Sequence, residues 1–378
     1  ATFRETPPMN DSPPFTRLVA GLPATVPFVA PEAIERATGR RIALRLGANE
    51  STFGPSLKAR DAMCAAAARV SFYGDPESYE LRGALAGHLG VGVEHLVIGC
   101  GIDDLLGLIV RVFLDPGETA VTSLGAYPTF NYHVAGYGGR IERVPYRGDR
   151  NDLDTLAATA TRAGARLVFL ANPDNPTGSW YDADEVTAFA EALPADCLLL
   201  LDEAYHDFAP AEAIPPLDAD DPRVVRLRTF SKAHGMAGAR IGYAVAAEPT
   251  IRAFDKVRLH FGVSLLAQEG ALASLGDPDF LRGVVAEVTA GRQEYTDLGQ
   301  SLGLPTLPSA TNFVAFDTGS PTRARALMEA LAARDVFVRV PGAPPLDRLL
   351  RVTVGTPAER AAFAEELRAV VAAEREQP

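Results

Sequence analysis

Short apolar runs alternate with segments of helical periodicity along much of the chain, beginning near residue 95. The runs are apolar almost throughout, which is typical of strands that are covered on both faces. Strands that alternate with helices predict an α/β fold with a mostly parallel sheet sandwiched by helices. The predicted strands are 96–99, 120–123, 140–146, 166–171, 198–205, 224–230 and 241–246, and the predicted helices between them include 103–114 and 182–193.

The pattern changes after a long predicted helix at 279–302. The remaining segments predict a smaller α+β C-terminal domain, with strands at 312–317, 336–340 and 349–355 and helices at 322–334 and 358–373. The first thirty or so residues are rich in proline, which disfavours long regular elements and indicates an extended arm. We therefore expect an N-terminal arm at 1–44, a large domain at 45–260 and a small C-terminal domain at 261–378.

Composition narrows the choice of partners and compartment. The 378 residues are 47% hydrophobic and carry a formal net charge of -12, which disfavours binding to nucleic acid. Cys64, Cys100 and Cys197 are odd in number and scattered, as expected for reduced thiols, and no Cys/His spacing predicts a metal site. No apolar run approaches the roughly 20 residues needed to cross a bilayer. We expect a cytoplasmic protein without a membrane, metal or nucleic-acid partner.

A lysine after the predicted strand 224–230 is the first candidate for chemistry. Lys232 follows Ser231 and precedes a turn of small residues, and Arg240 comes eight positions later. Such a lysine can bind an aldehyde cofactor covalently while Ser231 and Arg240 hold the phosphate of that cofactor, which is the pattern that pyridoxal phosphate requires. Taken alone, the same residues also suit an ordinary surface turn.

Polar residues at the ends of other predicted strands complete this pattern. Asp202 ends an apolar strand, where its carboxylate can pair with a protonated pyridine nitrogen, and Tyr205 can donate to the phenolic oxygen of the ring. Asn175, in a loop made rigid by two prolines, can bond the same oxygen. In sheets of this type, ligands bind beyond the carboxyl ends of the strands, so these side chains are expected to meet. A strand-end cap and a common turn are the competing interpretations.

Two further motifs suit a phosphate and a planar ring. Gly101, Ile102 and Asp103 open a predicted helix, where main-chain N–H groups can hold an anion. Tyr127 follows another predicted strand and can stack on a ring, although an ordinary packed aromatic is also compatible.

In this order, the motifs resemble those of the fold-type I pyridoxal-phosphate enzymes, specifically the class I/II aminotransferases of the histidinol-phosphate aminotransferase group. The resemblance extends from about Leu22 to the C-terminus. It is carried by Leu46-Gly47-Ala48-Asn49-Glu50, Tyr73-Gly74-Asp75-Pro76-Glu77-Ser78, Tyr127-Pro128, Asn175-Pro176-Thr177-Gly178, Asp202-Glu203-Ala204-Tyr205, Ser231-Lys232, Arg240 and Arg351-Val352-Thr353-Val354-Gly355.

The resemblance implies a cofactor, pyridoxal 5'-phosphate, and a role for each matching residue. Lys232 would be the catalytic lysine, with its pKa lowered by burial and by the nearby cation of Arg240. Arg351 would bind the substrate carboxylate as a bidentate clamp. A homodimer is also implied, in which Tyr73 reaches the phosphate in the neighbouring active site. The reaction implied is a ping-pong transfer of an amino group from a small-molecule amino donor to a 2-oxo acid such as 2-oxoglutarate.

The amino donor is less closely defined by the resemblance. Arg339 matches a family arginine that contacts the phosphate of histidinol phosphate, whereas Phe28 replaces a tyrosine whose hydroxyl usually contacts it. Asn49 begins a turn that departs from the family pattern, with Ser51 and Thr52 in place of Asn and Pro. Each lost polar partner costs roughly 1 to 3 kcal/mol in a site built for a phosphate, so an aromatic amino acid is a competing substrate.

Two other functions share this fold and cofactor. A decarboxylase of the threonine-phosphate type would release carbon dioxide without needing a 2-oxo acid. A non-catalytic pyridoxal-phosphate regulator would carry a basic DNA-binding module, which the residues before 45 do not resemble.

Overall fold

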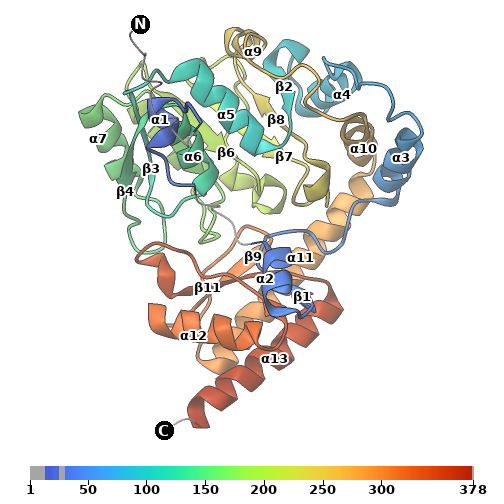
Figure 1. The fold of residues 1–378 in the computed structure, drawn as a ribbon, viewed down its shortest axis with the longest axis vertical. Coiled ribbons are helices and arrows are strands. Elements are labelled where there is room, and N and C mark those ends of the chain that lie inside the picture. The colour runs from blue at the N-terminus through green and yellow to red at the C-terminus, as the bar shows by residue number, and fades with distance from the viewer. Residues whose placement is uncertain (1–12, 25–29, 377–378) are drawn as a thin grey trace, which may run out of the picture.

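The computed structural model describes residues 13–24 and 30–376, which form a larger part and a smaller part (Figure 1). The larger part is built on a seven-stranded sheet with the order β2-β8-β7-β6-β5-β3-β4. Strand β8 is antiparallel to both of its neighbours, and the other pairs are parallel, which confirms the predicted mostly parallel sheet. The strands are β2 (Leu96–Gly99), β3 (Thr119–Ser123), β4 (Arg140–Val144), β5 (Leu167–Ala171), β6 (Leu198–Asp202), β7 (Val224–Thr229) and β8 (Gly242–Val245).

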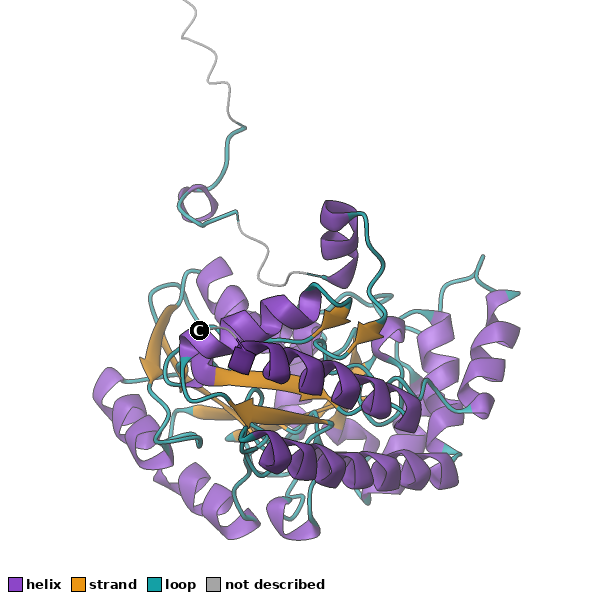
Figure 2. Cartoon of the chain, turned by 90° about the horizontal axis from the view of Figure 1, so that it is seen from below, coloured by secondary structure: helices purple, strands orange, loops and turns teal. Residues whose placement is uncertain are grey.

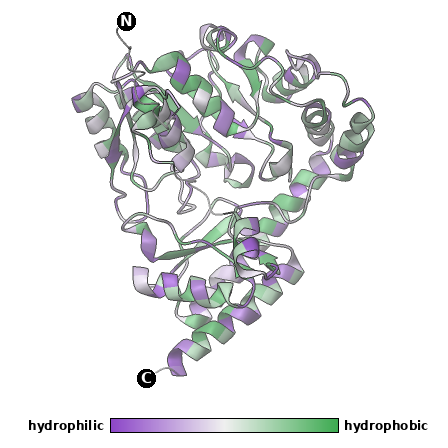
Figure 3. Cartoon of the chain, viewed as in Figure 1, coloured by the Kyte–Doolittle hydropathy of each residue, from purple (hydrophilic) through white to green (hydrophobic). Residues whose placement is uncertain are grey.

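Both faces of the sheet are covered, as its apolar strands require. Successive residues of β6 enter two separate cores: Leu200 packs in one cluster with α5, and Leu199 packs in another cluster with α7 and α8. Figure 2 shows helices on both sides of the strands, and Figure 3 shows that the strands are mainly hydrophobic. The helices of the first 275 residues are α1 (Arg17–Ala20), α2 (Pro31–Thr38), α3 (Leu57–Ala67), α4 (Tyr79–Leu89), α5 (Ile102–Phe113), α6 (Pro128–Gly136), α7 (Leu153–Ala163), α8 (Ala183–Ala192), α9 (Glu248–Phe254) and α10 (Leu265–Leu275).

The smaller part joins the C-terminal elements to a segment from the start of the chain. Antiparallel β9 (Phe313–Asp317) and β11 (Leu349–Thr353) form one pair, and parallel β1 (Leu44–Arg45) and β10 (Val336–Phe337) form another. The helices α12 (Pro321–Ala332) and α13 (Pro357–Glu376) pack on these strands and on each other. The long helix α11 (Pro278–Leu302) extends from the larger part into the smaller one (Figure 1).

The division into 1–44, 45–260 and 261–378 stays a prediction. Two elements pack against a different part of the molecule from the one that this division assigns to them. Helix α10 belongs by sequence to the predicted C-terminal domain, but it packs against α3 and α4 in the larger part. Strand β1 lies at the predicted boundary of the arm and pairs with β10. The two parts are therefore tied together by segments that are distant in sequence.

Two predicted strands, 198–205 and 336–340, are each three residues shorter in the structure. The segment 198–205 leaves the sheet at Asp202, because the N–H of Ala204 donates to Asp202 Oδ1 and turns the chain. The segment 336–340 contains only the two-residue strand β10, followed by an isolated antiparallel bridge between Arg339 and Arg351. Both departures place polar side chains at the edge of an apolar strand.

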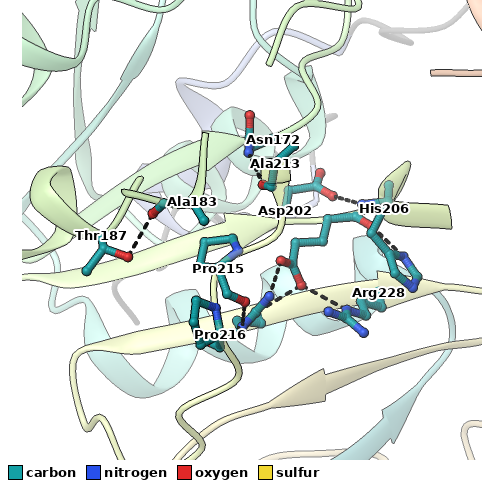
Figure 4. A network of polar contacts seen from close by, with 12 residues as sticks. Asn172, Ala183, Thr187, Asp202, His206, Ala213, Pro215, Pro216 and Arg228 are labelled. Carbon is teal, nitrogen blue, oxygen red and sulfur yellow. Dashed lines mark hydrogen bonds and ion pairs between the residues drawn. The ribbon is translucent and has the colours of Figure 1, made fainter. Parts of the chain in front are cut away.

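A buried ion cluster lies beneath the end of β6. The carboxylate of Glu203 accepts from Arg228 Nε at 2.8 Å and from Arg226 Nε at 3.0 Å, and Arg226 also donates to the carbonyls of Pro215 and Pro216. Figure 4 shows this network beside Asp202. Burial opposes ionisation of Glu203, but Arg228 and Arg226 together lower its pKa to about 2. The cluster joins β6 to β7, the two strands that lead to Asp202 and Lys232.

No helix in the described part of the chain has both the length and the hydropathy to cross a membrane. Within residues 13–24 and 30–376, no group of three or more His, Cys, Asp or Glu side chains is arranged to hold a metal ion.

Candidate active site

A cavity of about 860 Å³ lies where the ends of β5, β6 and β7 face β11. It brings together most of the side chains that the sequence singled out. The predicted site residues that line it are Asn49, Ile102, Asp103, Tyr127, Asn175, Asp202, Tyr205, Ser231, Lys232, Arg240, Arg339 and Arg351.

Lys232 follows the end of β7 and begins a tight turn that fixes its position. Gly235 in this turn has φ +69°, and a Cβ there would lie 2.0 Å from the carbonyl oxygen of Gly54, so no larger residue fits. The Lys232 amine donates to the main-chain oxygen of Asn49 at 3.0 Å. Burial, followed by the positive charge of Arg351, lowers the pKa of Lys232 to about 8. The sequence had suggested Arg240 as the neighbouring cation, but the contributing guanidinium is that of Arg351.

Asp202 presents a buried carboxylate at the end of β6. Its Oδ1 accepts from the N–H of Ala204 at 2.9 Å, and within the described residues it forms no ion pair. Burial raises the pKa of Asp202 to about 7. A buried carboxylate is costly unless it is paired, so this position favours a ligand with a cationic or hydrogen-donating nitrogen.

Tyr205 and Asn49 are hydrogen-bonded to each other in the wall of the cavity. Asn49 Nδ2 donates to the Tyr205 hydroxyl oxygen at 2.9 Å. Burial raises the pKa of Tyr205 to about 12, so the phenol keeps its proton and can donate it to a ligand oxygen. The Tyr205 ring packs edge-on against Phe313 of β9, with a centroid separation of 5.5 Å.

Arg351 lies on β11 and contacts Asn175 across the cavity. Arg351 Nη1 donates to Asn175 Oδ1 at 2.5 Å, which leaves the amide NH₂ of Asn175 to face other groups. Burial lowers the pKa of Arg351 to about 10, and its Nε is buried without a hydrogen-bond partner. A buried guanidinium with an unused donor favours an anionic ligand.

Arg339 joins Arg351 on the same wall. The two residues are paired through their main chains, and Arg339 Nε and Arg351 Nη2 each donate to the carbonyl of Gly47 at 3.2 Å. Burial also lowers the pKa of Arg339. Two guanidiniums on one wall of the cavity favour an anionic ligand.

The start of α5 forms a cup opposite this wall. Gly101 has φ +83°, and a Cβ there would lie 2.7 Å from Arg240 Nη2, so glycine makes room for the guanidinium. Arg240 Nη2 donates to Asp103 Oδ2 at 3.4 Å, and the hydroxyl of Tyr127 donates to Asp103 Oδ1 at 2.8 Å. The unpaired N–H groups of a helix start, together with this guanidinium, make an anion site.

The cavity does not account for two of the predicted site residues. Tyr73 does not line the cavity, because its side chain is 81% exposed and packs on Phe261 with a ring separation of 4.7 Å. Phe28 lies outside the residues that the structure describes.

The sequence interpretation missed several residues around the cavity. Thr353 and Asn312 hydrogen-bond to Asn49, and Arg45 joins Glu32 and Glu50 at the rim. Thr353 lies within the motif at 351–355, two residues after Arg351 on the same strand, and this spacing was the available signal. No local sequence pattern marked Asn312 or Arg45 as a site residue, because their positions depend on contacts between distant segments.

His234, next to Lys232 in the sequence, packs in the interior. Its Nδ1 contacts Ser274 Oγ at 2.8 Å, and its ring lies 4.7 Å from that of Phe230. Burial lowers the pKa of His234, so the ring is neutral near pH 7. The structure gives His234 a packing role.

Comparison with known proteins defines the class. The chain matches the family model "Aminotransferase class I and II" over residues 41–367. A histidinol-phosphate aminotransferase of Moorella thermoacetica is 35% identical over 370 residues, covering 97% of this chain and 95% of that protein. Another from an Anaeromyxobacter species is 37% identical over 341 residues, covering 89% and 93%. The crystal structure of histidinol-phosphate aminotransferase from Sinorhizobium meliloti, in complex with pyridoxal-5'-phosphate, superposes with a TM-score of 0.93 at 49% identity, covering 97% of this chain and 99% of that one.

The chain therefore belongs to the class I and II aminotransferases, which are pyridoxal-phosphate-dependent enzymes with a fold-type I architecture. Within that class, it belongs to the histidinol-phosphate aminotransferase family. The family is one of transaminases, so the decarboxylase and the non-catalytic regulator have no support.

The cavity fits this cofactor on its own geometry. The carboxylate of Asp202 lacks a cationic partner among the described residues, as a site for a pyridine nitrogen requires. Gly101 leaves space beside Arg240 at a helix start, which suits a phosphate. Lys232 opens into the same cavity with a lowered pKa, as an amine that reacts with an aldehyde requires.

Proposed function

We propose that this enzyme transfers the amino group of histidinol phosphate, an amino-alcohol phosphate, to a 2-oxo acid such as 2-oxoglutarate. The observation that carries the proposal is the pair formed by Arg339 and Arg351, two half-buried arginines that are bridged through their main chains and line the same cavity. Two adjacent guanidiniums suit a phosphate dianion better than the single negative charge of a carboxylate. The names of the relatives support the same substrate.

We assign the cofactor contacts by the position of each side chain. Asp202 holds the pyridine nitrogen, Tyr205 and Asn175 hold the ring oxygen, and Tyr127 stacks on the ring. Ser231, Arg240 and the main chain at 101–103 hold the phosphate. When bound, pyridoxal phosphate supplies an aldehyde that takes up the amino group and a ring that accommodates the electron pair left on the substrate carbon.

Lys232 performs the proton transfer in this proposal. With a pKa of about 8, a substantial fraction of its amine is neutral near neutral pH and can take the proton from the carbon that bears the amino group. Arg351 and Arg339 hold the anionic end of the substrate, which places that carbon near Lys232 Nζ. The same residues bind the 2-oxo acid in the second half of the reaction, where Arg351 holds its carboxylate.

The test is a comparison of amino donors in single-turnover half-reactions of the purified holoenzyme. Histidinol phosphate is expected to react faster than phenylalanine, tyrosine or phosphothreonine, as followed by the loss of the cofactor's absorbance. Lys232→Ala is expected to abolish turnover. Equal rates with histidinol phosphate and phenylalanine would show that the substrate is wrong, and turnover retained in K232A would show that the role of Lys232 is wrong.

We further propose that the enzyme is a homodimer in which Tyr73 contacts the phosphate in the neighbouring active site. The support is an exposed aromatic and aliphatic cluster around Tyr73, distant from the chain's own cavity. The large exposed hydrophobic side chains of this region are Val70, Phe72, Tyr73, Tyr79, Leu259 and Phe261. Exposed apolar clusters of this kind mark interaction surfaces.

A further inference from the structure

Residues 46–50 form a strap that crosses from the smaller part of the molecule to the cavity. The N–H of Leu46 donates to the carbonyl of Phe337 at 2.9 Å, and the N–H of Thr353 donates to the carbonyl of Leu46 at 2.8 Å, which fixes the start of the strap. The next carbonyl, that of Gly47, accepts from both substrate-facing arginines. The strap therefore contacts these two arginines with its main chain.

Asn49 lies in this strap and forms hydrogen bonds through its N–H, its carbonyl and its side chain. It is 2% exposed, and its backbone is in the left-handed region at φ +54°. Its carbonyl accepts from Lys232 Nζ at 3.0 Å and from Asn312 Nδ2 at 3.1 Å. Its N–H donates to Thr353 Oγ1 at 3.1 Å, and its side-chain Nδ2 donates to the hydroxyl of Tyr205 at 2.9 Å.

We propose that Asn49 is a positioning residue that aligns the amine of Lys232 through its carbonyl and the hydroxyl of Tyr205 through its amide. This inference rests on the proposed function, in which Lys232 moves the proton and Tyr205 holds the ring oxygen. One buried residue thereby sets the distance between the base and the ring.

The chemistry of the contacts explains why a main-chain acceptor suits this place. Lys232 has four rotatable bonds, and a fixed acceptor limits the positions of its amine when the amine is not bonded to the cofactor. A carboxylate in the same position would strongly favour the charged form of the amine, whereas a carbonyl orients the amine and raises its pKa much less. The left-handed backbone, fixed by Thr353 and Asn312, directs the carbonyl toward Lys232.

Other charged and titratable groups also face Lys232. They are Arg351 on β11, Glu50 on the strap, Asp202 and Tyr205 at the end of β6 and Asp103 on α5. Substitutions at Asn49 and Thr353 leave the charged residues unchanged, and Asn49→Gly and Asn49→Ala both remove the amide that holds the Tyr205 hydroxyl. A difference in the pKa of Lys232 between these two variants therefore reports on the Asn49 carbonyl.

Asn49→Gly and Asn49→Ala separate the two contacts. Both substitutions remove the amide that holds Tyr205. Glycine adopts φ +54° freely and keeps the carbonyl in place, whereas alanine disfavours this conformation and shifts the carbonyl away from Lys232. A second pair tests the carbonyl without altering Asn49: Thr353→Val removes the hydroxyl that accepts from the Asn49 N–H, and Thr353→Ser keeps it.

The first measurement uses the apoenzyme and does not depend on turnover. The pKa of Lys232 is obtained from the pH dependence of its labelling by an amine-reactive reagent, quantified by mass spectrometry. We expect wild type, N49G and T353S to titrate together, and N49A and T353V to titrate at least about 0.5 lower, because the ammonium loses its acceptor. An identical pKa in N49A and N49G, with T353V equal to T353S, overturns the role of the carbonyl.

The second measurement is the single-turnover rate of the holoenzyme with histidinol phosphate. We expect about a tenfold loss in N49G and about a hundredfold loss in N49A, with N49G/Y205F no slower than Y205F, because the amide acts through that hydroxyl. Asp335→Gly and Asp335→Ala are the matched controls, since Asp335 is another left-handed residue, at φ +62°, and does not line the cavity.

Wild-type rates in both Asn49 variants overturn the inference. That result leaves the proposed function intact if K232A is still inactive. Turnover in K232A instead contradicts the proposed function itself, and the apoenzyme titration then still reports on the contact between Asn49 and Lys232.

Discussion

Burial acts in opposite directions on the two principal ionisable side chains of the cavity. It raises the pKa of Asp202 to about 7 and lowers the pKa of Lys232 to about 8, so each residue is driven toward its neutral form. Both shifts reflect groups that lack a bound partner of opposite charge. The buried site therefore lowers the stability of the apoenzyme, and a bound charged ligand would offset this loss.

The Asp202→Asn variant tests that cost. The folded pKa of Asp202 is above its ordinary value of 3.8, so its contribution to the free energy of unfolding is lost as the pH rises from about 4 to about 7. Asparagine has nearly the same shape and no charge. We expect apo D202N to match the wild-type apoenzyme at pH 4 and to be more stable at pH 8 by about 4 kcal/mol, since one pKa unit corresponds to about 1.4 kcal/mol. Urea unfolding at the two pH values measures the difference.

The same substitution is expected to weaken cofactor binding, because the pyridine nitrogen loses its carboxylate. D61N, which removes an exposed carboxylate, controls for the change in net charge. A D202N apoenzyme that is less stable than wild type at pH 8 would contradict the assignment of a buried charge without a partner.

Some residues of the site could be predicted from the sequence and others could not. Lys232, Asp202 and Arg351 were predictable, because each follows or occupies an apolar strand and a motif of this family surrounds it. The cation that lowers the pKa of Lys232 was wrongly predicted, since it depends on a strand more than a hundred residues away. The hydrogen bond from Asn49 to Tyr205 spans 156 positions and had no local signal.

Gly101, at the start of α5, leaves room for the guanidinium of Arg240 because it has no side chain. We expect Gly101→Ala to weaken cofactor binding about tenfold or more, because the new Cβ displaces Arg240 Nη2 from the cup and charged hydrogen bonds are worth about 1.5–3 kcal/mol. Titration of the apoenzyme with pyridoxal phosphate measures this loss.

Gly117→Ala is the matched control. Gly117 has φ +88°, close to the +83° of Gly101, and no atom lies within 4 Å of the place that a Cβ would take there. Both substitutions carry a similar backbone strain, and only G101A meets Arg240. Equal cofactor affinities in the two variants would show that strain alone explains the effect.

The ion cluster between β6 and β7 predicts a large effect on stability. Glu203→Gln leaves Arg226 and Arg228 buried without a carboxylate, and breaking a buried ion pair in this way costs about 3–5 kcal/mol. Chemical unfolding measures the change. Glu248→Gln, which breaks an exposed pair with Arg252, is expected to cost less than about 1 kcal/mol. Comparable losses in the two variants would contradict the structural role of the buried cluster.

The apolar pattern predicted the strands well where they are buried on both faces of the sheet. The ends of β6 and β10 did not, because the turn at Ala204 and the bridge at Arg339 depend on polar contacts outside the strands. Short helices such as α6 and α9 carry weak periodicity, and their packing on the sheet determines them.

The whole molecule is expected to act as a pair of chains. Mixing K232A with Tyr73→Ala and allowing the chains to exchange should restore activity, because a hybrid dimer contains one site with both Lys232 and Tyr73. Random exchange at equal amounts should restore about a quarter of the wild-type sites. Each variant alone is expected to have little activity, and sedimentation checks that both remain dimers.

A mixture that stays at the activity of Y73A alone would contradict the shared site. Exposure of Tyr73 to solvent would then need another explanation, such as a contact within the same chain upon closure.

The strap is hydrogen-bonded to residues that lie far from it in the sequence, and this separation has a consequence for biosynthesis. Asn49 and Thr353 are joined across 304 positions, and Lys232 lies between them. During synthesis the seven-stranded sheet can be complete after β8, at Val245, while β11 has yet to be made. A nascent chain therefore has its lysine in place long before the strap can be anchored, and a finished site first exists only once translation has passed residue 353.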